Sequence, residues 1–293
     1  MTSRTRIAAL LVTPLLVLAG CGSDDTGADQ RPASGSTKHQ SPSGEESPSE
    51  SSQPGDGQTT VPLYFTGDTP QGTRLYREFR RVDSADALGA ALTLAASGDA
   101  LDPDYGTLLP SGTFSTSGGA AIPLPDDSWT RLPEGMSESD ALVAVQQLVY
   151  TAQGVLQSRD PITFTDSSGA ATQIFGIASE DGFTAADPIK TLSLVNVTAP
   201  EEGATVSGSF TASGVSSSFE ATTPWEVRDS SGKAVLQGSA MADGWMDKLY
   251  PWETDVDVSG LEPGQYTFAV MTDDPSGGEG PGPMVDTKSI TVQ

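Results

Sequence analysis

The single cysteine of this 293-residue chain, Cys21, limits what the chain can fold into, because no disulfide can form within it. The folded parts must therefore be held by hydrophobic cores, and the length allows two domains of typical size. Cys21 follows an apolar run at Ile7–Leu18, which Arg4 and Arg6 precede and two small residues close. This order is typical of a secretory signal peptide, and about a dozen apolar residues are fewer than the ~20 that a membrane-spanning helix needs.

The four residues at 18–21, Leu-Ala-Gly-Cys, resemble a bacterial lipobox. In that motif the signal is cleaved before the cysteine and the thiol receives a diacylglycerol, and two acyl chains suffice for stable anchoring. The alternative is a free or disulfide-bonded thiol, but Cys21 has no second cysteine to pair with, and exposed free thiols are uncommon in oxidising compartments. We therefore expect a signal peptide at 1–20, lipid attachment at Cys21, and a lipid-anchored protein on the extracytoplasmic face of the cell membrane.

The chain is strongly acidic, with 39 Asp and Glu residues against 15 Lys and Arg residues. Cleavage of the signal removes two positive charges and takes the formal net charge from −24 to −26. Nucleic acids require clustered Lys and Arg, so a nucleic-acid partner is not expected, nor is adhesion of the whole molecule to an anionic lipid or polymer. Solubility after export and adaptation to high salt would both produce this acidity.

Residues 21–60 have the composition of a disordered tether. The 39 residues of Gly22–Thr60 include no Val, Ile, Leu, Met, Phe, Trp or Tyr. Such a segment buries too little apolar surface to offset its chain entropy. As a flexible coil it would span roughly 35 Å, enough to hold a folded part away from the membrane.

Residues 61–180 have the pattern of an α+β domain. Two β-type runs open it, at Val61–Phe65 and Thr73–Val82. Apolar residues at helical spacing over 88–95, followed by Gly98 as a C-cap, then predict a helix that Asp83 or Ser84 caps at its start.

A second helix is predicted at 137–154, after a stretch rich in Gly and Pro at 101–133 that favours loops and short strands. Ser137 and Asp140 suit a capping box in its acidic variant. The segments 162–165 and 171–177, separated by a turn at 166–169, read as a hairpin. The apolar stripe of the helix is formed by Leu142, Val145, Leu148, Val149 and Leu156.

Residues 190–293 have the pattern of an all-β sandwich of the immunoglobulin type. Seven short β-like segments in about 100 residues, separated by turn residues, are typical of that fold. The segment 261–266 resembles the corner of such sandwiches in which a tyrosine hydroxyl, here that of Tyr266, bonds back to nearby backbone. The predicted strands are Leu192–Val197, Ser207–Ala212, Trp225–Arg228, Ala234–Gln237, Glu253–Val258, Tyr266–Met271 and Ser289–Val292.

Both regions resemble known modules. Residues 61 to about 178 resemble the GerMN domain of sporulation and germination lipoproteins, and residues from about 191 resemble the immunoglobulin-like domain of bacterial spore germination. The first resemblance is carried by VPLYF at 61–65, the arginine-bearing run at 75–82, LLPSGT at 108–113, ALVAVQQLVYT at 141–151 and ITF at 162–164. The second is carried by APEEG at 199–203, VSG at 206–208, ASG at 212–214, SFEA at 218–221 and GQY at 264–266.

The resemblance implies an extracytoplasmic lipoprotein with an accessory or scaffolding role in the cell envelope. The matching motifs are structural, so they point to an architecture rather than an activity. The germination role need not transfer, because similar modules also occur in lipoproteins of bacteria that make no endospores.

The only histidine, His39, lies in the predicted tether, so the folded part has neither His nor Cys. This composition excludes Ser-His-Asp and Cys-His catalysis, imidazole as a general base, and zinc sites that need those ligands. The chain also lacks a G-x-S-x-G elbow and a phosphate-binding P-loop. We expect no catalytic residue, no cofactor and no metal.

Three weaker motifs have simpler explanations. Ser230 and Lys233 fit the serine–lysine spacing of penicillin-recognising enzymes, but they stand in a predicted turn. The pairs Asp102/Asp104 and Asp255/Asp257 have the residue type of glycosidases, although such spacing on a strand usually marks a solvated face. The segment 102–106 offers oxygen ligands for calcium, but its glycine comes one position too early for an EF-hand loop.

Two groups of residues are candidates for binding. Arg77 and Arg80 belong to a run with Arg74 and Arg81 that would form an anion-binding patch, unless these arginines pair with neighbouring acids. The second group is aromatic, and such residues stack on sugars, anchor protein partners or fill a sandwich core. This group comprises Trp225, Trp245, Trp252 and Tyr250.

The preferred hypothesis is a non-catalytic binding or scaffolding lipoprotein that engages an envelope protein. The alternatives are a protein that binds cell-wall glycan, a wall hydrolase that uses carboxylates alone, and a carrier with an enclosed apolar cavity. A hydrolase would need two carboxylates facing each other at ~5–5.5 Å or ~6.5–9.5 Å across a pocket. A carrier would need a cavity of roughly 300 Å³ or more.

Overall fold

A computed structural model describes residues 57–116, 121–274 and 278–293. The predicted signal peptide, Cys21 and the tether up to residue 56 lie outside the described residues. Within the described part, no helix is both long and apolar enough to cross a membrane.

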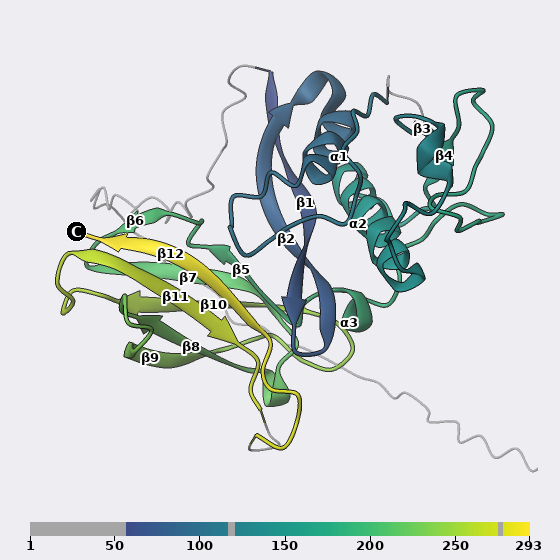
Figure 1. Cartoon of the computed structure of the whole chain (residues 1–293). Coiled ribbons are helices and arrows are strands. Elements are labelled where there is room, and N and C mark those ends of the chain that lie inside the picture. Colours follow the sequence, from purple (N-terminus) through teal and green to yellow (C-terminus); the bar gives the residue numbers. More distant parts are fainter. Residues whose placement is uncertain (1–56, 117–120, 275–277) are drawn as a thin grey trace, which may run out of the picture. The chain divides into compact units, whose positions relative to one another are not determined.

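The first region opens with a long antiparallel hairpin of β1 (Gln58–Thr69) and β2 (Gly72–Asp83), shown in blue in Figure 1. β1 begins at Gln58, so the predicted end of the tether at residue 60 is wrong by three residues. The reason is pairing, because Thr59 and Thr60 are β-branched and lie opposite Val82 and Arg81.

Two helices lie beside this hairpin, α1 (Ala87–Ser97) and α2 (Glu138–Leu156). Gly98 ends α1 in the left-handed conformation, as predicted. The predicted start is different, because Asp86 caps α1 while Asp83 caps a preceding 3₁₀ turn, η1 (Ser84–Asp86).

The capping box of α2 is confirmed, since Ser137 and Asp140 exchange their bonds at its first turn. Its predicted apolar stripe is partly wrong. Leu142 and Leu156 are 56% and 48% exposed, whereas Val145, Leu148 and Val149 are buried.

The predicted hairpin at 162–177 forms only next to its turn, where the Asp166 N–H donates to the Ala170 carbonyl and the Thr172 N–H donates to the Phe164 carbonyl. β4 (Thr163–Thr165) pairs in parallel with β3 (Ala121–Pro123), and only a single bridge joins Thr165 to Ala171. No second strand continues beyond that bridge, because Phe175 is buried in the core and stacks on Trp129. Trp129 itself lies in a 3₁₀ turn, η2 (Asp127–Thr130).

The second region is an eight-stranded β-sandwich of the immunoglobulin type. A short helix, α3 (Pro188–Thr191), leads into it, and a parallel bridge joins Leu75 to Leu192. All seven predicted strands are confirmed, and Tyr266 donates its hydroxyl to the carbonyl oxygen of Glu262 at 2.9 Å. One sheet has the order β10-β7-β5 and the other β6-β12-β11-β8-β9. The strands are β5 (Val195–Ala199), β6 (Ala204–Val206), β7 (Ser209–Ser216), β8 (Thr222–Arg228), β9 (Ala234–Met241), β10 (Tyr250–Asp257), β11 (Gly264–Met271) and β12 (Val285–Val292).

Each region has its own hydrophobic core. The largest fully buried side chains of the first core include Trp129, Phe164 and Phe175, and Phe268 and Met284 fill the sandwich.

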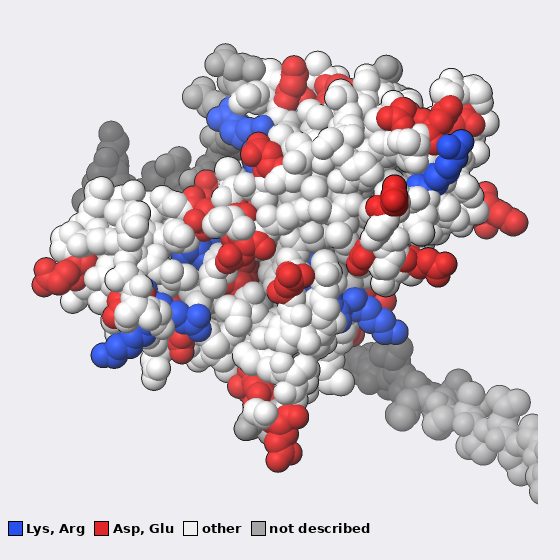
Figure 2. Space-filling model, in the orientation of Figure 1, with Lys and Arg blue, Asp and Glu red and all other residues white. Residues whose placement is uncertain are grey.

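Acidic side chains are spread over the face of the molecule drawn in Figure 2, with basic side chains in fewer places.

Candidate functional site

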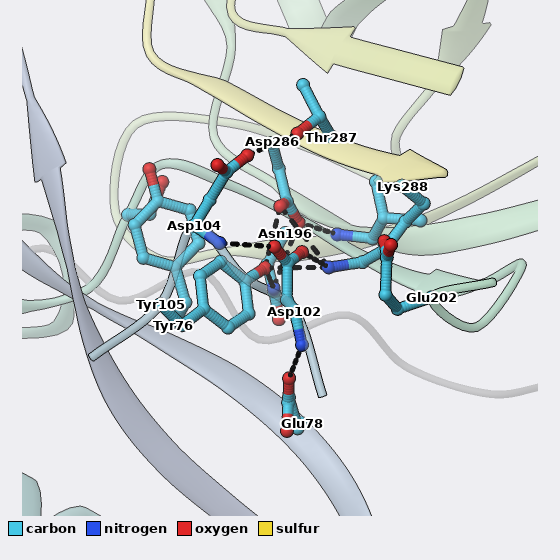
Figure 3. A network of polar contacts seen from close by, with 12 residues as sticks. Tyr76, Glu78, Asp102, Asp104, Tyr105, Asn196, Glu202, Asp286, Thr287 and Lys288 are labelled. Carbon is cyan, nitrogen blue, oxygen red and sulfur yellow. Dashed lines mark hydrogen bonds and ion pairs between the residues drawn. The ribbon is translucent and has the colours of Figure 1, made fainter. Parts of the chain in front are cut away.

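A cluster of buried polar side chains, which we call the polar junction, joins β2 and the loop after α1 to β5 and β12 (Figure 3). Strand alternation explains part of it, because Asp286 and Lys288 are two residues apart on β12 and share a face. The members of the polar junction are Glu78, Asp102, Tyr105, Asn196, Asp286 and Lys288, all buried.

Asp286 accepts hydrogen bonds from both sides of the junction. The Tyr105 hydroxyl donates to its Oδ1 at 2.6 Å, and Asn196 Nδ2 donates to its Oδ2 at 3.1 Å. The backbone N–H of Val197 also donates to this carboxylate. Burial raises the pKa of Asp286, and the charge of Lys288 opposes that rise.

Lys288 supplies the one cation between two acids. Its Nζ donates to Asp102, and to the Tyr105 hydroxyl at 2.9 Å, and lies 3.5 Å from Asp286 Oδ1. Burial alone would lower the pKa of Lys288, but Asp286 and Asp102 outweigh it and raise that pKa. Burial raises the pKa of Asp102 to about 6, although Lys288 opposes the rise.

Glu78 fixes the loop that carries Asp102. Its two carboxylate oxygens accept from the backbone N–H groups of Leu101 at 3.0 Å and Asp102 at 2.8 Å. Arg80 lies 3.7 Å from the same carboxylate. The acids of the polar junction are therefore engaged in bonds between elements, which is the chemistry of a structural ion cluster.

The predicted solvated face is wrong for Asp102, which is buried against Lys288. Asp104 accepts from the Thr287 hydroxyl at 2.7 Å, and Asp255 accepts from the Thr211 hydroxyl at 2.9 Å. Among the described residues, no group of three acids, histidines or cysteines has the geometry to hold a metal ion. In the segment 102–106, which the sequence offered as a calcium site, Asp102 is bonded to the ammonium group of Lys288 instead.

A pocket of about 180 Å³ beside the polar junction has three glutamates, Arg77 and Lys288 as its charged lining residues. Glu78 is committed to backbone N–H groups, as described above, and Glu202 accepts from the backbone N–H of Ser289 at 2.8 Å. The third, Glu201, is the direct neighbour of Glu202 in sequence. Two of the three glutamates in this pocket thus hold structural hydrogen bonds. A wall hydrolase would need two carboxylates that are free to act on a substrate.

The arginines of β2 do not form one patch. Strand alternation places Arg74 and Arg80 on one face and Arg77 and Arg81 on the other. Arg80 pairs with Glu78 and Asp99, so for this arginine the alternative of pairing with neighbouring acids is the one observed. Arg77 lies over the ring of Phe79 and donates to Thr198 at 3.4 Å.

The three tryptophans occupy different environments. Trp252 is 3% exposed and belongs to the sandwich core. Trp225 is half-buried against Phe268 and Gly238, where any side chain in place of the glycine would overlap the indole. Trp245 is exposed in the loop between β9 and β10, and its ring meets Phe219 edge to face at 5.1 Å.

The segment at 229–233 is a turn, closed by hydrogen bonds from Asp229 N–H to the Lys233 carbonyl and from Gly232 N–H to the Asp229 carbonyl. Asp229 also accepts from Ser231. These bonds explain the residue types at Ser230 and Lys233 without catalysis.

Comparison with known families identifies both regions. Residues 62–166 match the Germane family, described as sporulation and spore germination. Residues 194–279 match the Gmad2 family, the immunoglobulin-like domain of bacterial spore germination. The chain thus carries a Germane (GerMN) domain followed by a Gmad2 domain, in the order that the sequence predicted.

No curated protein matches the chain. Among solved structures, a crystal structure of an engineered protein is similar at 16% identity, with a TM-score of 0.28. The match covers 44% of this chain and 24% of the engineered one, so the chain spans about a quarter of that protein.

Proposed function

From this pair of germination-associated domains, we propose that the protein is a lipid-anchored, extracytoplasmic scaffold that performs no catalysis and binds an envelope protein. Anchoring would be through Cys21, and the tether would carry the two domains away from the membrane. Binding would be through an exposed apolar surface of the Gmad2 domain.

The observation that carries this proposal is the exposed aromatic cluster, defined as Phe219 and Trp245, whose rings meet edge to face, with Met246 next to Trp245 in the chain and Met241 at the end of β9. The first two side chains are 38% and 36% exposed, and the two methionines are 63% and 67% exposed. Large apolar side chains gathered on a surface mark interaction sites, and aromatic residues and Met are enriched there. Burying each one in a partner would contribute about 1.5–3 kcal/mol.

The backbone under this cluster is held in an unusual conformation. Glu220, Ala221 and Met246 have positive φ angles of 51°, 61° and 84°. Ser217 Oγ accepts from the Met246 N–H at 3.0 Å, and Ala221 accepts from the Ala242 N–H at 2.9 Å. Such strained residues persist where the surrounding structure fixes them, which supports a preformed binding surface.

Charge indicates what kind of protein would bind. Glu220, Asp243 and Asp247 lie within two residues of the aromatic cluster in sequence. The one nearby cation, Lys248, lies over the Tyr250 ring at 4.7 Å. The matching partner is a protein surface with an apolar pocket bordered by Lys and Arg.

Membrane attachment is tested in a bacterium that processes lipoproteins. Wild-type chain should incorporate labelled palmitate and sediment with membranes, and Cys21→Ala should do neither. Release of both proteins into the soluble fraction would contradict anchoring.

The binding surface is tested by placing a photo-crosslinking amino acid at position 245. The control places it at Leu142, which is exposed on the first domain. We expect one envelope protein to crosslink at 245 but not at 142, and the band to disappear in Phe219→Asp but not in Val235→Asp. Identical bands from both positions would contradict a specific surface.

A further inference from the structure

Two adjoining pockets share Tyr64, Tyr150 and Arg159, and we call them together the tyrosine groove. One pocket, of about 210 Å³, extends to Arg77, Asn196 and Lys248, and the other, of about 270 Å³, extends along α2 to Gln153 and Gln157. Together they fall within the ~300–1,000 Å³ that is usual for small-ligand sites.

The charge of the tyrosine groove is opposite to that of the chain. Its charged lining residues are Arg77, Arg159 and Lys248, and no Asp or Glu lines either pocket. The ion pairs found among the described residues use other cations, namely Arg80, Lys190, Arg228 and Lys288. Three cations without a paired carboxylate, in a chain of net charge −24, indicate an anionic ligand.

The nearest acids in sequence are engaged elsewhere. Asp160 accepts from the Ser158 hydroxyl at 2.7 Å, and Asp187 lies 3.9 Å from Lys190. Asp247 accepts from the Tyr250 hydroxyl at 2.8 Å. The Tyr250 hydroxyl and, to a smaller extent, Lys248 lower the pKa of Asp247, so Lys248 has an acid beside it. Arg77 and Arg159 have no acid within ion-pair distance among the described residues.

Buried polar atoms without a hydrogen-bond partner gather in the same place. Five such side-chain atoms occur in the described chain, and three of them belong to groove residues: Arg77 Nε, Gln153 Oε1 and Asn196 Oδ1. The other two are indole nitrogens of the sandwich domain. Unsatisfied buried groups are rare because each costs about 1–3 kcal/mol, so three in one groove require an explanation.

The two amide side chains are oriented by their nitrogens. Gln153 Nε2 donates to the carbonyls of Arg159 and Asp160, and Asn196 Nδ2 donates to Asp286 and Tyr105. Both residues are 3% exposed. Their oxygens are therefore left as acceptors without a donor among the described residues, and a ligand with hydroxyl groups would supply donors.

The aromatic lining supplies a flat apolar surface. Tyr64 and Tyr150 have ring centroids 5.2 Å apart, tilted at 51°. The Tyr150 hydroxyl donates to the Ala186 carbonyl at 2.7 Å, which fixes its ring, and the half-buried Tyr64 remains to contact a ligand. Tyrosine faces pack well against the apolar face of a sugar ring.

We propose that the tyrosine groove binds an acidic sugar, that is, a sugar ring with free hydroxyls and a carboxylate or phosphate. The hydroxyls donate to Gln153 and Asn196, the anionic group lies against Arg77, Arg159 and Lys248, and the ring packs on Tyr64. The groove contains no residue of the exposed aromatic cluster, although Lys248 lies near both. Arg159→Gln and Phe219→Asp therefore test the two sites separately.

The test is titration calorimetry on the full lipidated chain in detergent micelles. The probes are a galacturonic acid trisaccharide, glucose 6-phosphate, neutral maltotriose and inorganic phosphate. We expect binding of one or both acidic sugars, at least tenfold tighter than either maltotriose or inorganic phosphate. The tighter of the two acidic probes assigns the anionic group as carboxylate or phosphate.

Arg159→Gln should weaken acidic-sugar binding about tenfold, the value of one charged hydrogen bond. The matched control is Arg131→Gln, an exposed arginine outside the groove, which should bind as wild type. Equal losses in the two variants, equal affinity for maltotriose and the acidic sugars, or no binding of either acidic sugar would each overturn the proposal.

Discussion

The polar junction and the tyrosine groove are both polar and both include buried side chains, although Arg159 and Lys248 of the groove are exposed, and they differ in how their hydrogen bonds are satisfied. In the junction, Tyr105, Asp286 and Lys288 bond to one another, and no side-chain atom of these three lacks a partner among the described residues. In the groove, three side-chain atoms lack one. Asn196 belongs to both, with Nδ2 bonded in the junction and Oδ1 unpartnered in the groove.

This difference separates structure from binding. A satisfied buried network contributes to holding elements together, whereas unsatisfied groups cost stability and are retained where they serve another purpose. Variants in the junction should therefore act mainly on the free energy of unfolding. Variants in the groove should act mainly on ligand affinity.

The largest expected effect follows from Lys288→Met in the polar junction. The change leaves Asp102 and Asp286 buried without their cation, and breaking a buried ion pair in this way costs about 3–5 kcal/mol. Urea unfolding followed by tryptophan fluorescence measures it. Lys190→Met, whose lysine side chain is 82% exposed, should stay within about 0.5 kcal/mol of wild type. A loss below 1 kcal/mol in Lys288→Met would contradict the structural role of the junction.

The second effect is a pH dependence that comes from Asp102. Its pKa is about 6 in the folded protein against 3.8 in the unfolded chain. Between these values only the folded state holds the proton, so the contribution to stability is full below pH 3.8 and is lost as the pH rises through about 6. The loss is up to about 3 kcal/mol, from two pKa units at 1.36 kcal/mol each.

Unfolding free energies at pH 4.5 and pH 7.5 measure this dependence. Asp102→Asn should remove that part of the pH slope, and the exposed Asp255→Asn should keep the wild-type slope. The same slope in wild type and Asp102→Asn would show that Asp102 does not titrate as stated.

The third comparison removes one hydroxyl from each site. Tyr105→Phe deletes a group that donates to Asp286 and accepts from Lys288, and it should cost about 1–3 kcal/mol. Tyr64→Phe in the groove should change the unfolding free energy by less than about 0.5 kcal/mol. Thermal unfolding by circular dichroism measures both, and a larger loss for Tyr64→Phe would reverse the comparison.

Local patterns predicted much of the fold. The sandwich strands are short alternating runs, as in β10, where Trp252 and Val256 point into the core between exposed neighbours. The capping box predicted the start of α2 because it lies within four consecutive residues. β6 was missed because its three residues are too few to show an alternating pattern, and its parallel pairing with β12 is not local.

The polar junction could not be predicted, because its members are far apart in sequence. Asp102 bonds to Lys288 across 186 positions, so its i, i+2 spacing with Asp104 indicated a solvated face instead. Within the groove, the arginine run identified Arg77, but nothing distinguished Gln153 or Asn196. A weak signal was present, since Gln147 and Gln153 are polar residues on the buried surface of α2.

The smallest expected effect on stability is that of Arg77→Gln. Arg77 Nε already lacks a partner, and its one side-chain hydrogen bond, to Thr198, is long at 3.4 Å. Removing the guanidinium should therefore change the unfolding free energy by no more than about 1 kcal/mol. Arg80→Gln serves as the comparison, because Arg80 bonds to the Asp99 carbonyl and pairs with Glu78 and Asp99, and it should cost more.

Affinity should rank the two arginine variants in the opposite order. Arg77→Gln should weaken acidic-sugar binding about tenfold, and Arg80→Gln should leave it unchanged, because Arg80 does not line the groove. Urea unfolding and titration calorimetry on the same two proteins give both values. If the variant that loses more stability also loses more affinity, the groove acts only through the fold, and its unpartnered atoms have no role in binding.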